Sequence, residues 1–412
     1  MLVPEKRIAD FEKLGFGMFV HWGLYSQLGE GEWVYDFHKD NYPMSEYCKL
    51  QDTFTAEDFD AEEMVLAAKR AGCKYITLTT RHHEGFSLYD TCGLNTYDAP
   101  HSPAGRDLIK EFVDACNKHG IIPFFYHTTL DWYNEDFNND FDTYLEYLRK
   151  SVEILCTNYG KIGGLWFDGN WSKLDADWKE GELYATIRKH QPEAMIINNT
   201  GLDARGEAGH PEIDSVTFEQ GRPTPMDRTN MSKYVAAEMC YTLNDHWGCG
   251  YGDFNYKSPK ELIECLCDCR KVGANLLLNI GPTAQGGIIP IQKEYLNIMG
   301  AWMDLFGEAI YNGKPYSISE NGRDFILKGD DNTLYLFAYD VGRLGSNNVV
   351  WVGFTEPDVS IKLHGDTVAS VKWMDNNQEL EFNQNGDELT VRCTGYNYGT
   401  NYCVRVAKIT LK

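Results

Sequence analysis

Short apolar runs and amphipathic stretches alternate along the first three quarters of the chain. The apolar runs have the length and continuity of buried strands, and they cover residues 16–22, 74–80, 121–126, 162–168, 194–199, 215–219, 235–243 and 275–280. Apolar positions at helical spacing, typical of helices that cover a sheet, occur over residues 58–71, 105–119, 137–159, 180–190 and 258–272. Strands and helices that alternate in this way predict a parallel sheet.

Polar residues of the kinds used in catalysis follow four of the predicted strands. The clearest case is Asp168, which ends an apolar run and is followed at once by Gly169, so we expect the chain to turn sharply there. An isolated Asp-Gly pair more often caps a turn, but polar clusters also follow three other strands, at residues 21–23, 81–86 and 279–282. Because (β/α)8 barrels keep their chemistry at the carboxyl ends of their strands, the sequence predicts a (β/α)8-type (TIM-like) barrel over residues 1–312.

A doubly wound open sheet is the alternative architecture for the same alternation of strands and helices. Proteins of that class bind nucleotides through a glycine-rich turn after the first strand. No such fingerprint follows residues 16–22, and nothing in the chain indicates phosphate or nucleotide use. We therefore favour the barrel.

The pattern changes at about residue 312, beyond which short alternating runs replace the longer elements. These runs cover residues 324–328, 333–338, 348–353, 359–363, 370–373, 380–382, 388–392 and 403–411. Turn-forming Asp, Asn and Gly residues separate them. The sequence predicts a small C-terminal antiparallel β-sandwich over residues 313–412, which we expect to stabilise the protein or flank the substrate rather than to catalyse.

Composition and charge narrow the class of partner. The 412 residues carry a net charge of −23, which argues against nucleic acid or an anionic membrane as partner. No segment has the length and apolarity of a membrane span. Residues 1–14 are charged and lack the apolar core of a signal peptide, so we expect a cytoplasmic location. Nothing in the sequence predicts the oligomeric state.

Twelve cysteines raise the question of a metal site, because Cys265, Cys267 and Cys269 are closely spaced. Residues 258–272 begin with Ser-Pro, a common helix start. On that helix Cys265 and Cys269 share a face with apolar residues, while Cys267 points away from them. We therefore interpret these cysteines as core residues and expect neither a metal nor another cofactor.

Five motifs, in the same order along the chain, resemble those of the α-L-fucosidases of glycoside hydrolase family 29. They are Phe16-Gly17-Met18-Phe19-Val20-His21-Trp22-Gly23, Glu32-Trp33, Arg81-His82-His83-Glu84-Gly85-Phe86, Leu165-Trp166-Phe167-Asp168-Gly169, and Asn275-Leu276-Leu277-Leu278-Asn279-Ile280-Gly281-Pro282. A C-terminal β-sandwich is also a feature of that family. Five ordered motifs are far more specific than any single one.

The resemblance implies a retaining exo-α-L-fucosidase acting on a fucosylated glycan. Such an enzyme needs a carboxylate nucleophile and a carboxylic acid that protonates the departing oxygen. Asp168 matches the family's nucleophile position, and Glu219 lies in a stretch that resembles the one bearing the acid/base. Glu212 and Glu238 are the competing candidates for the acid/base. Glu32 could raise the pKa of either catalytic acid if it lies close.

The resemblance also assigns the residues expected to bind the sugar. They are His21, Glu32, Trp33, His82, His83, Tyr126, Trp166 and Trp247. Histidines can pair with the hydroxyls of fucose, and aromatic rings can cover its methyl group. We do not expect His82 and His83 to bind a metal, because adjacent side chains on an extended chain diverge.

Two departures from the family pattern concern the leaving-group and linkage preference. Many members carry Tyr-Tyr after the third strand, where this chain has Phe125-Tyr126. Many carry a basic residue at the end of the fifth-strand motif, where this chain reads Asn198-Asn199-Thr200, and Arg222 could supply that charge instead. The alternative functions are a barrel hydrolase for another 6-deoxy or galacto-configured sugar and a catalytically inactive fucose-binding homologue.

Overall fold

A computed structural model describes residues 2–229, 231–330, 332–343 and 357–412 of the chain. The chain forms two compact units. The first unit holds residues 1–257 and 275–297, and the second holds residues 258–274 and 298–412. The proposed division of the chain at residue 312 stays a prediction, and the two units are described separately.

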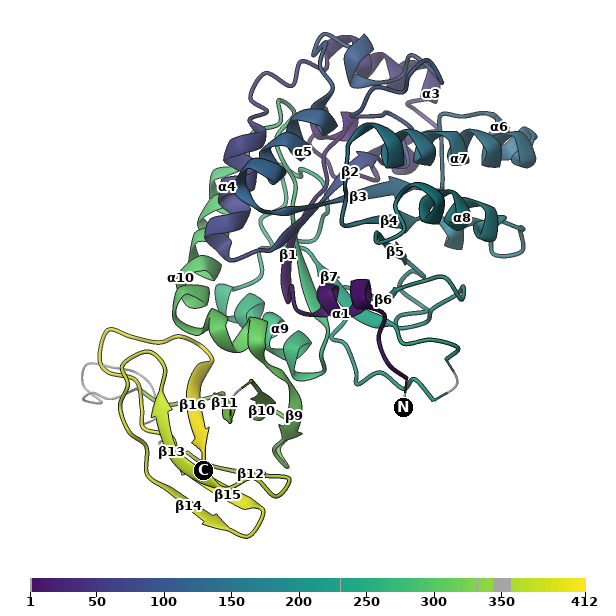
Figure 1. Ribbon diagram of the computed structural model, residues 1–412. Coiled ribbons are helices and arrows are strands. Elements are labelled where there is room, and N and C mark those ends of the chain that lie inside the picture. Colours follow the sequence, from purple (N-terminus) through teal and green to yellow (C-terminus); the bar gives the residue numbers. More distant parts are fainter. Residues whose placement is uncertain (1, 230, 331, 344–356) are drawn as a thin grey trace. The chain divides into compact units, whose positions relative to one another are not determined.

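Eight parallel strands close into a barrel in the first unit (Figure 1). The strands are β1 (Phe16–Val20), β2 (Tyr75–Arg81), β3 (Ile122–Thr128), β4 (Gly164–Asp168), β5 (Met195–Asn198), β6 (Ser215–Glu219), β7 (Ala236–Tyr241) and β8 (Asn275–Ile280). They pair in sequence order, and β8 closes the ring on β1. The predicted barrel is confirmed, and the open-sheet alternative is wrong.

Helices follow most of the strands. In the first unit they are α2 (Val34–His38), α3 (Met44–Tyr47), α4 (Ala61–Ala71), α5 (Leu108–His119), α6 (Asp136–Asn139), α7 (Phe141–Asn158) and α8 (Glu180–His190). Helices α4 and α5 begin at the side-chain caps Asp60 and Asp107 and end at left-handed Gly72 and Gly120. Residues 199–214 and the described part of 220–235 contain no helix, so long loops follow β5 and β6.

Helix α1 (Lys6–Glu12), which the sequence analysis did not predict, lies against the amino-terminal end of the barrel. Its Phe11 ring contacts those of Tyr75 and Phe124, at centroid distances of 5.5 and 5.8 Å. Asn275 donates a hydrogen bond to the Phe11 carbonyl, and Arg7 forms an ion pair with the buried Asp214. These contacts close the barrel at the end opposite to the predicted site.

Two antiparallel sheets make up most of the second unit. One has the strand order β13-β16-β11-β10-β9 and the other β12-β15-β14. The strands are β9 (Lys314–Ile318), β10 (Phe325–Lys328), β11 (Thr333–Ala338), β12 (Asp358–Lys362), β13 (Val368–Trp373), β14 (Phe382–Asn385), β15 (Glu388–Arg392) and β16 (Arg405–Leu411). Helix α9 (Pro259–Lys271) and the end of α10 (Pro290–Asn312) also belong to this unit.

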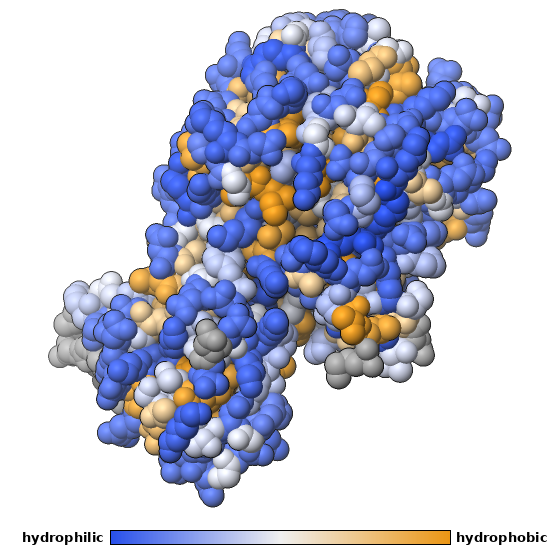
Figure 2. Space-filling model, viewed as in Figure 1, coloured by the Kyte–Doolittle hydropathy of each residue, from blue (hydrophilic) through white to orange (hydrophobic). Residues whose placement is uncertain are grey.

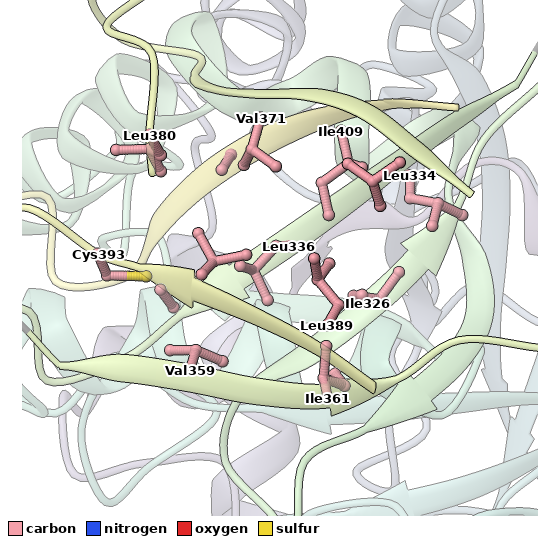
Figure 3. Close-up of a cluster of buried hydrophobic side chains, with 14 of the residues drawn as sticks. Ile326, Leu334, Leu336, Val359, Ile361, Val371, Leu380, Leu389, Cys393 and Ile409 are labelled. Atoms are coloured by element: carbon pink, nitrogen blue, oxygen red, sulfur yellow. The ribbon is translucent and has the colours of Figure 1, made fainter. Parts of the chain in front are cut away.

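The core of the second unit lies between its two sheets (Figure 3). Leu336 and Ile409 from the larger sheet face Val359, Ile361 and Leu389 from the smaller one. Alternate residues of β12 are buried and exposed, which is the pattern of a strand with one face on a core. The predicted β-sandwich is confirmed. The predicted strand at residues 348–353 lies outside the described residues, and β9 and α10 were not predicted.

Hydrophilic residues dominate the visible surface, with apolar side chains gathered in small areas (Figure 2). Within the described residues, no helix combines the length and the apolarity that a membrane span requires. Cys265, Cys267 and Cys269 are all buried on α9. Across the same part of the chain, no group of three or more His, Cys, Asp or Glu residues could hold a metal ion.

Candidate active site

The carboxyl end of β4 delivers Asp168 to the open end of the barrel. The chain then turns at Gly169, whose φ of 122° is unfavourable for residues with a side chain. A Cβ at Gly169 would also lie 2.5 Å from the Leu130 nitrogen. The sharp turn predicted after Asp168 is confirmed, and it requires glycine for both reasons.

Four polar groups surround the Asp168 carboxylate. Trp171 donates its indole N–H to Oδ1 at 2.7 Å, and Tyr126 donates its hydroxyl to Oδ2 at 3.1 Å. Asn199 donates its amide to Oδ1 at 3.2 Å, and the Nε2 atom of His83 lies 3.5 Å from Oδ2. The donors among them, Trp171, Tyr126 and Asn199, reach both oxygens, so they hold the carboxylate in one orientation and stabilise its charge.

Asn199 connects Asp168 to the second acid, Glu219, at the end of β6. Its amide nitrogen lies 2.7 Å from Glu219 Oε2 and 3.2 Å from Asp168 Oδ1, so it donates one hydrogen to each carboxylate. The carbonyl oxygen of the same amide accepts hydrogen bonds from the Thr217 hydroxyl at 2.9 Å and the Gly201 N–H at 3.3 Å. These bonds fix which way the amide points.

The environment of Glu219 favours its protonated form. Burial and the negative charge of Asp168 raise the pKa of Glu219 to about 7. The Asn199 hydrogen bond and the positive charge of Arg205 act in the opposite direction, and Glu32 adds a smaller raising effect, as the sequence analysis proposed. A carboxyl group with this pKa can donate a proton at neutral pH.

Three histidines beside the carboxylates are neutral at ordinary pH. Burial lowers the pKa of His82 to about 3. Burial and the neighbouring His82 also lower the pKa of His21 and of His83 well below the usual range. Neutral imidazoles each offer one N–H donor and one acceptor nitrogen, which suits sugar hydroxyls.

The hydrogen bonds of His21 and His83 determine which ring nitrogen carries the proton. Thr128 donates its hydroxyl to the Leu130 carbonyl at 2.5 Å, so it accepts from His83 Nδ1 at 2.7 Å. The Asn279 amide donates to the Trp247 carbonyl, so its oxygen accepts from His21 Nδ1 at 2.7 Å. Both histidines therefore keep Nε2 as an acceptor for a substrate hydroxyl.

A cavity of about 560 Å³ contains both carboxylates. Nine of the ten predicted site residues line it, namely His21, Trp33, His82, His83, Tyr126, Trp166, Asp168, Glu219 and Trp247. The His82 and His83 rings lie 4.2 Å apart and share this cavity, so the expectation that they diverge is wrong. Both residues follow the end of β2, and side chains alternate between faces only within a strand.

Glu32 is the predicted site residue that does not line the cavity. It is buried, and its Oε2 atom accepts hydrogen bonds from the backbone N–H groups of Trp247 and Gly248, at 3.0 and 2.8 Å. Burial raises the pKa of Glu32. Glu32 therefore holds in place the loop that carries Trp247, and Trp247 rather than Glu32 lines the cavity.

The two competitors for the acid/base role lie elsewhere. Glu212 is on the surface, where its carboxylate lies 3.5 Å from the Arg188 guanidinium. Glu238 is buried inside the barrel, and it accepts hydrogen bonds from the Tyr75 hydroxyl and, at 2.9 Å, from the Trp166 indole. Neither residue lines the cavity that contains Asp168.

The sequence analysis missed three polar contacts of this site. It assigned no role to Trp171 or Asn279, and it noted Asn199 only as a departure from a family pattern. Trp171 lies just after a predicted strand that ends in a site residue, and Asn199 ends another predicted strand. Those positions are the signals that could have identified them.

The structure also shows where the two departures from the family pattern lie relative to the site. Phe125 does not line the cavity and instead packs against Tyr159, with ring centroids 5.9 Å apart, so the lost hydroxyl is not at the site. The cation that acts on Glu219 is Arg205, whose guanidinium also donates to the Glu219 carbonyl. Arg222 lies over the Tyr241 ring, 5.6 Å from its centroid.

Comparison with known proteins identifies the family. The alpha-L-fucosidase family model matches residues 3–308. Tissue alpha-L-fucosidase from Homo sapiens is 31% identical over 340 residues, which span 75% of this chain and 70% of that protein. The counterpart from Macaca fascicularis is 31% identical over 336 residues, spanning 75% and 69%.

A solved structure agrees with these sequence matches over nearly the whole chain. Alpha-L-fucosidase isoenzyme 1 from Paenibacillus thiaminolyticus superposes with a TM-score of 0.84 and 32% identity, and the match covers 99% of each chain. The closed barrel, the sandwich and the paired carboxylates are therefore found in a chain whose sequence and structure both match one family. This chain belongs to the α-L-fucosidase family, glycoside hydrolase family 29.

Proposed function

We propose that this α-L-fucosidase removes terminal α-L-fucose from fucosylated glycans by double displacement, with Asp168 as nucleophile and Glu219 as acid/base. Membership of the family makes the protein a glycoside hydrolase with a fucosylated substrate.

In the first step, an Asp168 oxygen attacks the anomeric carbon while Glu219 protonates the glycosidic oxygen. The bond from the anomeric carbon to that oxygen breaks, and a fucosyl ester of Asp168 forms with inverted configuration. The Trp171 and Asn199 hydrogen bonds to Oδ1 leave Oδ2 as the attacking oxygen, once Tyr126 and His83 have adjusted to the sugar.

In the second step, Glu219 changes from acid to base. Formation of the ester removes the negative charge of Asp168, which is one of the two main causes that raise the pKa of Glu219. The carboxylate that remains after proton transfer is then a weaker base than in the free enzyme, and it takes a proton from the attacking water. Water displaces Asp168, and the second inversion restores the original configuration.

The sharing of Asn199 by the two carboxylates is the observation that supports this mechanism most. The donor lies 3.2 Å from one carboxylate oxygen and 2.7 Å from the other, so these oxygens are no more than about 6 Å apart. Retaining glycosidases separate their carboxyl groups by about 5–5.5 Å, and inverting enzymes by about 6.5–9.5 Å to admit a water molecule.

Two assays test the proposal. Release of L-fucose from an aryl α-L-fucoside, with little or no release of sugar from the corresponding galactoside, tests the specificity. NMR of the first-formed product tests the mechanism, because double displacement gives α-fucose before mutarotation. Initial formation of β-fucose would contradict the mechanism and leave the family membership intact.

A further inference from the structure

Two leucines at the catalytic cavity are exposed to solvent although they line it. Leu174 is 84% exposed and Leu202 is 53% exposed. Single exposed apolar residues are common on protein surfaces. These two, however, share one cavity with Asp168 and Glu219, so a bound molecule that extends out of the cavity would cover them.

Leu202 lies on the side of the cavity from which the leaving group must depart. The acid has to reach the glycosidic oxygen, so the group attached to that oxygen passes close to Glu219. The loop after β5 borders Glu219 at two points: Asn199 donates to its carboxylate at 2.7 Å, and Arg205 donates to its backbone carbonyl. Leu202 lies between these two residues in the same loop.

Leu174 belongs to the neighbouring wall. It follows the short helix η4 (Asn170–Lys173), whose Trp171 donates to Asp168. A Cβ on Gly201 would lie 3.5 Å from the Trp171 ring, so η4 and the loop that carries Leu202 are in contact. The two leucines therefore come from adjacent segments, one tied to the nucleophile and the other to the acid.

The inner part of the cavity differs in character from this edge. His21, His82 and His83 supply partners for hydroxyl groups, and they are almost fully buried. The edge offers isobutyl groups, which favour an apolar surface. A pyranose ring presents such a surface on the face that carries its axial C–H bonds.

We propose that Leu174 and Leu202 form the subsite for the leaving group, which receives the sugar that carries the fucose by its C–H face. This inference rests on the proposed function, because it uses Glu219 as the acid that defines the direction of departure. It names the specificity determinants of the same site and predicts that the enzyme distinguishes substrates by their leaving group.

The test compares two substrates that share the fucosyl unit. In α-L-fucosyl fluoride the leaving group is a single atom, whereas in a disaccharide of fucose and N-acetylglucosamine it is a pyranose. For the double variant Leu174→Ser, Leu202→Ser, we expect the ratio of kcat/KM for the disaccharide to kcat/KM for the fluoride to fall about tenfold, which corresponds to about 1.4 kcal/mol. The two single variants should each give part of this fall.

Ile298→Ser is the matched control, because Ile298 is also a partly exposed aliphatic residue but does not line the cavity. It should leave the ratio unchanged. An unchanged ratio in the leucine double variant would overturn the proposed subsite. If that variant also lost self-association while its ratio stayed unchanged, the leucines would instead contact a second copy of the chain. If the wild-type protein hydrolysed neither substrate, the proposed function itself would fail.

Discussion

Two glutamates on neighbouring barrel strands, the half-buried Glu219 and the buried Glu238, have similar pKa values but different surroundings. Burial raises the pKa of both Glu219 and Glu238 to about 7, and the charge of Asp168 contributes in the case of Glu219. Glu238 lies inside the barrel, where the Tyr75 hydroxyl and the Trp166 indole occupy its two oxygens. Glu219 lines the cavity and shares a donor with a second carboxylate.

This comparison shows that a raised pKa alone does not identify a catalytic acid. Burial shifts the pKa of any carboxyl group, whatever its role. What distinguishes Glu219 is access to the cavity and a partner carboxylate, Asp168, that shares the Asn199 donor with it. Substitution of these residues should therefore separate a catalytic glutamate from a structural one.

Removal of Asp168, the proposed nucleophile, should have the largest effect. For Asp168→Ala we expect kcat to fall on the order of 10⁴-fold, because the covalent intermediate can no longer form. The protein should stay folded, since Asp168 is at the mouth of the barrel. Added azide should restore part of the rate with an activated fucoside and give β-fucosyl azide. Failure of azide to rescue either Asp168→Ala or Asp168→Gly would place the nucleophile elsewhere.

Variants of Glu219 and Glu238 should then differ in how strongly their rates depend on the leaving group of the substrate. Glu219→Ala should slow hydrolysis of a fucosyl disaccharide by about 10²–10⁴-fold, and much less with an acidic phenol as leaving group, because only the first needs a proton. Azide should accelerate the reaction of the phenol substrate and give α-fucosyl azide. Glu238→Gln should change neither rate by more than a few-fold.

The opposite pattern would contradict the comparison. If Glu238→Gln or Glu212→Gln reproduced the dependence on leaving group and Glu219→Ala did not, Glu219 would not be the acid. Retention in the azide product separates loss of the acid/base from loss of the nucleophile, which gives inversion.

Glu219 and Glu238 should make similar contributions to the pH dependence of the free energy of unfolding. Each holds its proton more tightly in the folded protein, where the pKa is about 7, than in the unfolded chain, where it is close to the ordinary 4.5. The stabilisation from these carboxyl groups is therefore complete below pH 4.5 and is lost as the pH rises through 7.

Between pH 5 and pH 8 each glutamate should reduce the free energy of unfolding by about 2–3 kcal/mol. Glu219→Gln and Glu238→Gln should each remove one share of this pH dependence, measured by urea unfolding at both pH values. If only one of the two variants reduced the pH dependence of the free energy of unfolding, the pKa values of Glu219 and Glu238 in the folded protein would not be alike.

The bridging amide should have the smallest effect. Asn199 lowers the pKa of Glu219, so in Asn199→Leu the alkaline limb of the profile of kcat/KM against pH should move upward by about one pH unit, with a loss of about tenfold in rate. Asn198→Leu is the matched control. Asn198 donates to the Tyr184 hydroxyl at 2.9 Å, and it does not line the cavity. An equal shift in both variants would show that the change is a general effect on β5.

Much of the fold could be predicted from periodicity alone. All eight barrel strands and helices α4, α5, α7, α8 and α9 lie where the apolar pattern places them. Helix α1 could not be predicted in this way, because its seven residues bury only Ile8 and Phe11 and depend on the barrel beneath them.

Site residues could be predicted where they stand at the carboxyl end of a strand, as Asp168 and Glu219 do. Contacts between separate strands were not. Asn199 bridges the two acids because β5 lies between β4 and β6, and that juxtaposition exists only in the folded barrel. Glu32 joins a loop more than two hundred residues away in the sequence, so no local pattern shows that its carboxylate binds backbone rather than sugar.

The central claim, that Asp168 is the nucleophile, can be tested by trapping the ester itself. A 2-deoxy-2-fluoro-α-L-fucosyl fluoride slows both steps through the electron-withdrawing fluorine, while the fluoride leaving group keeps the first step fast enough for the intermediate to accumulate. Peptide mapping by mass spectrometry should find one fluorofucosyl group, on the peptide that contains Asp168 and at that residue. A label on Glu219, Glu238 or any other residue would contradict the account.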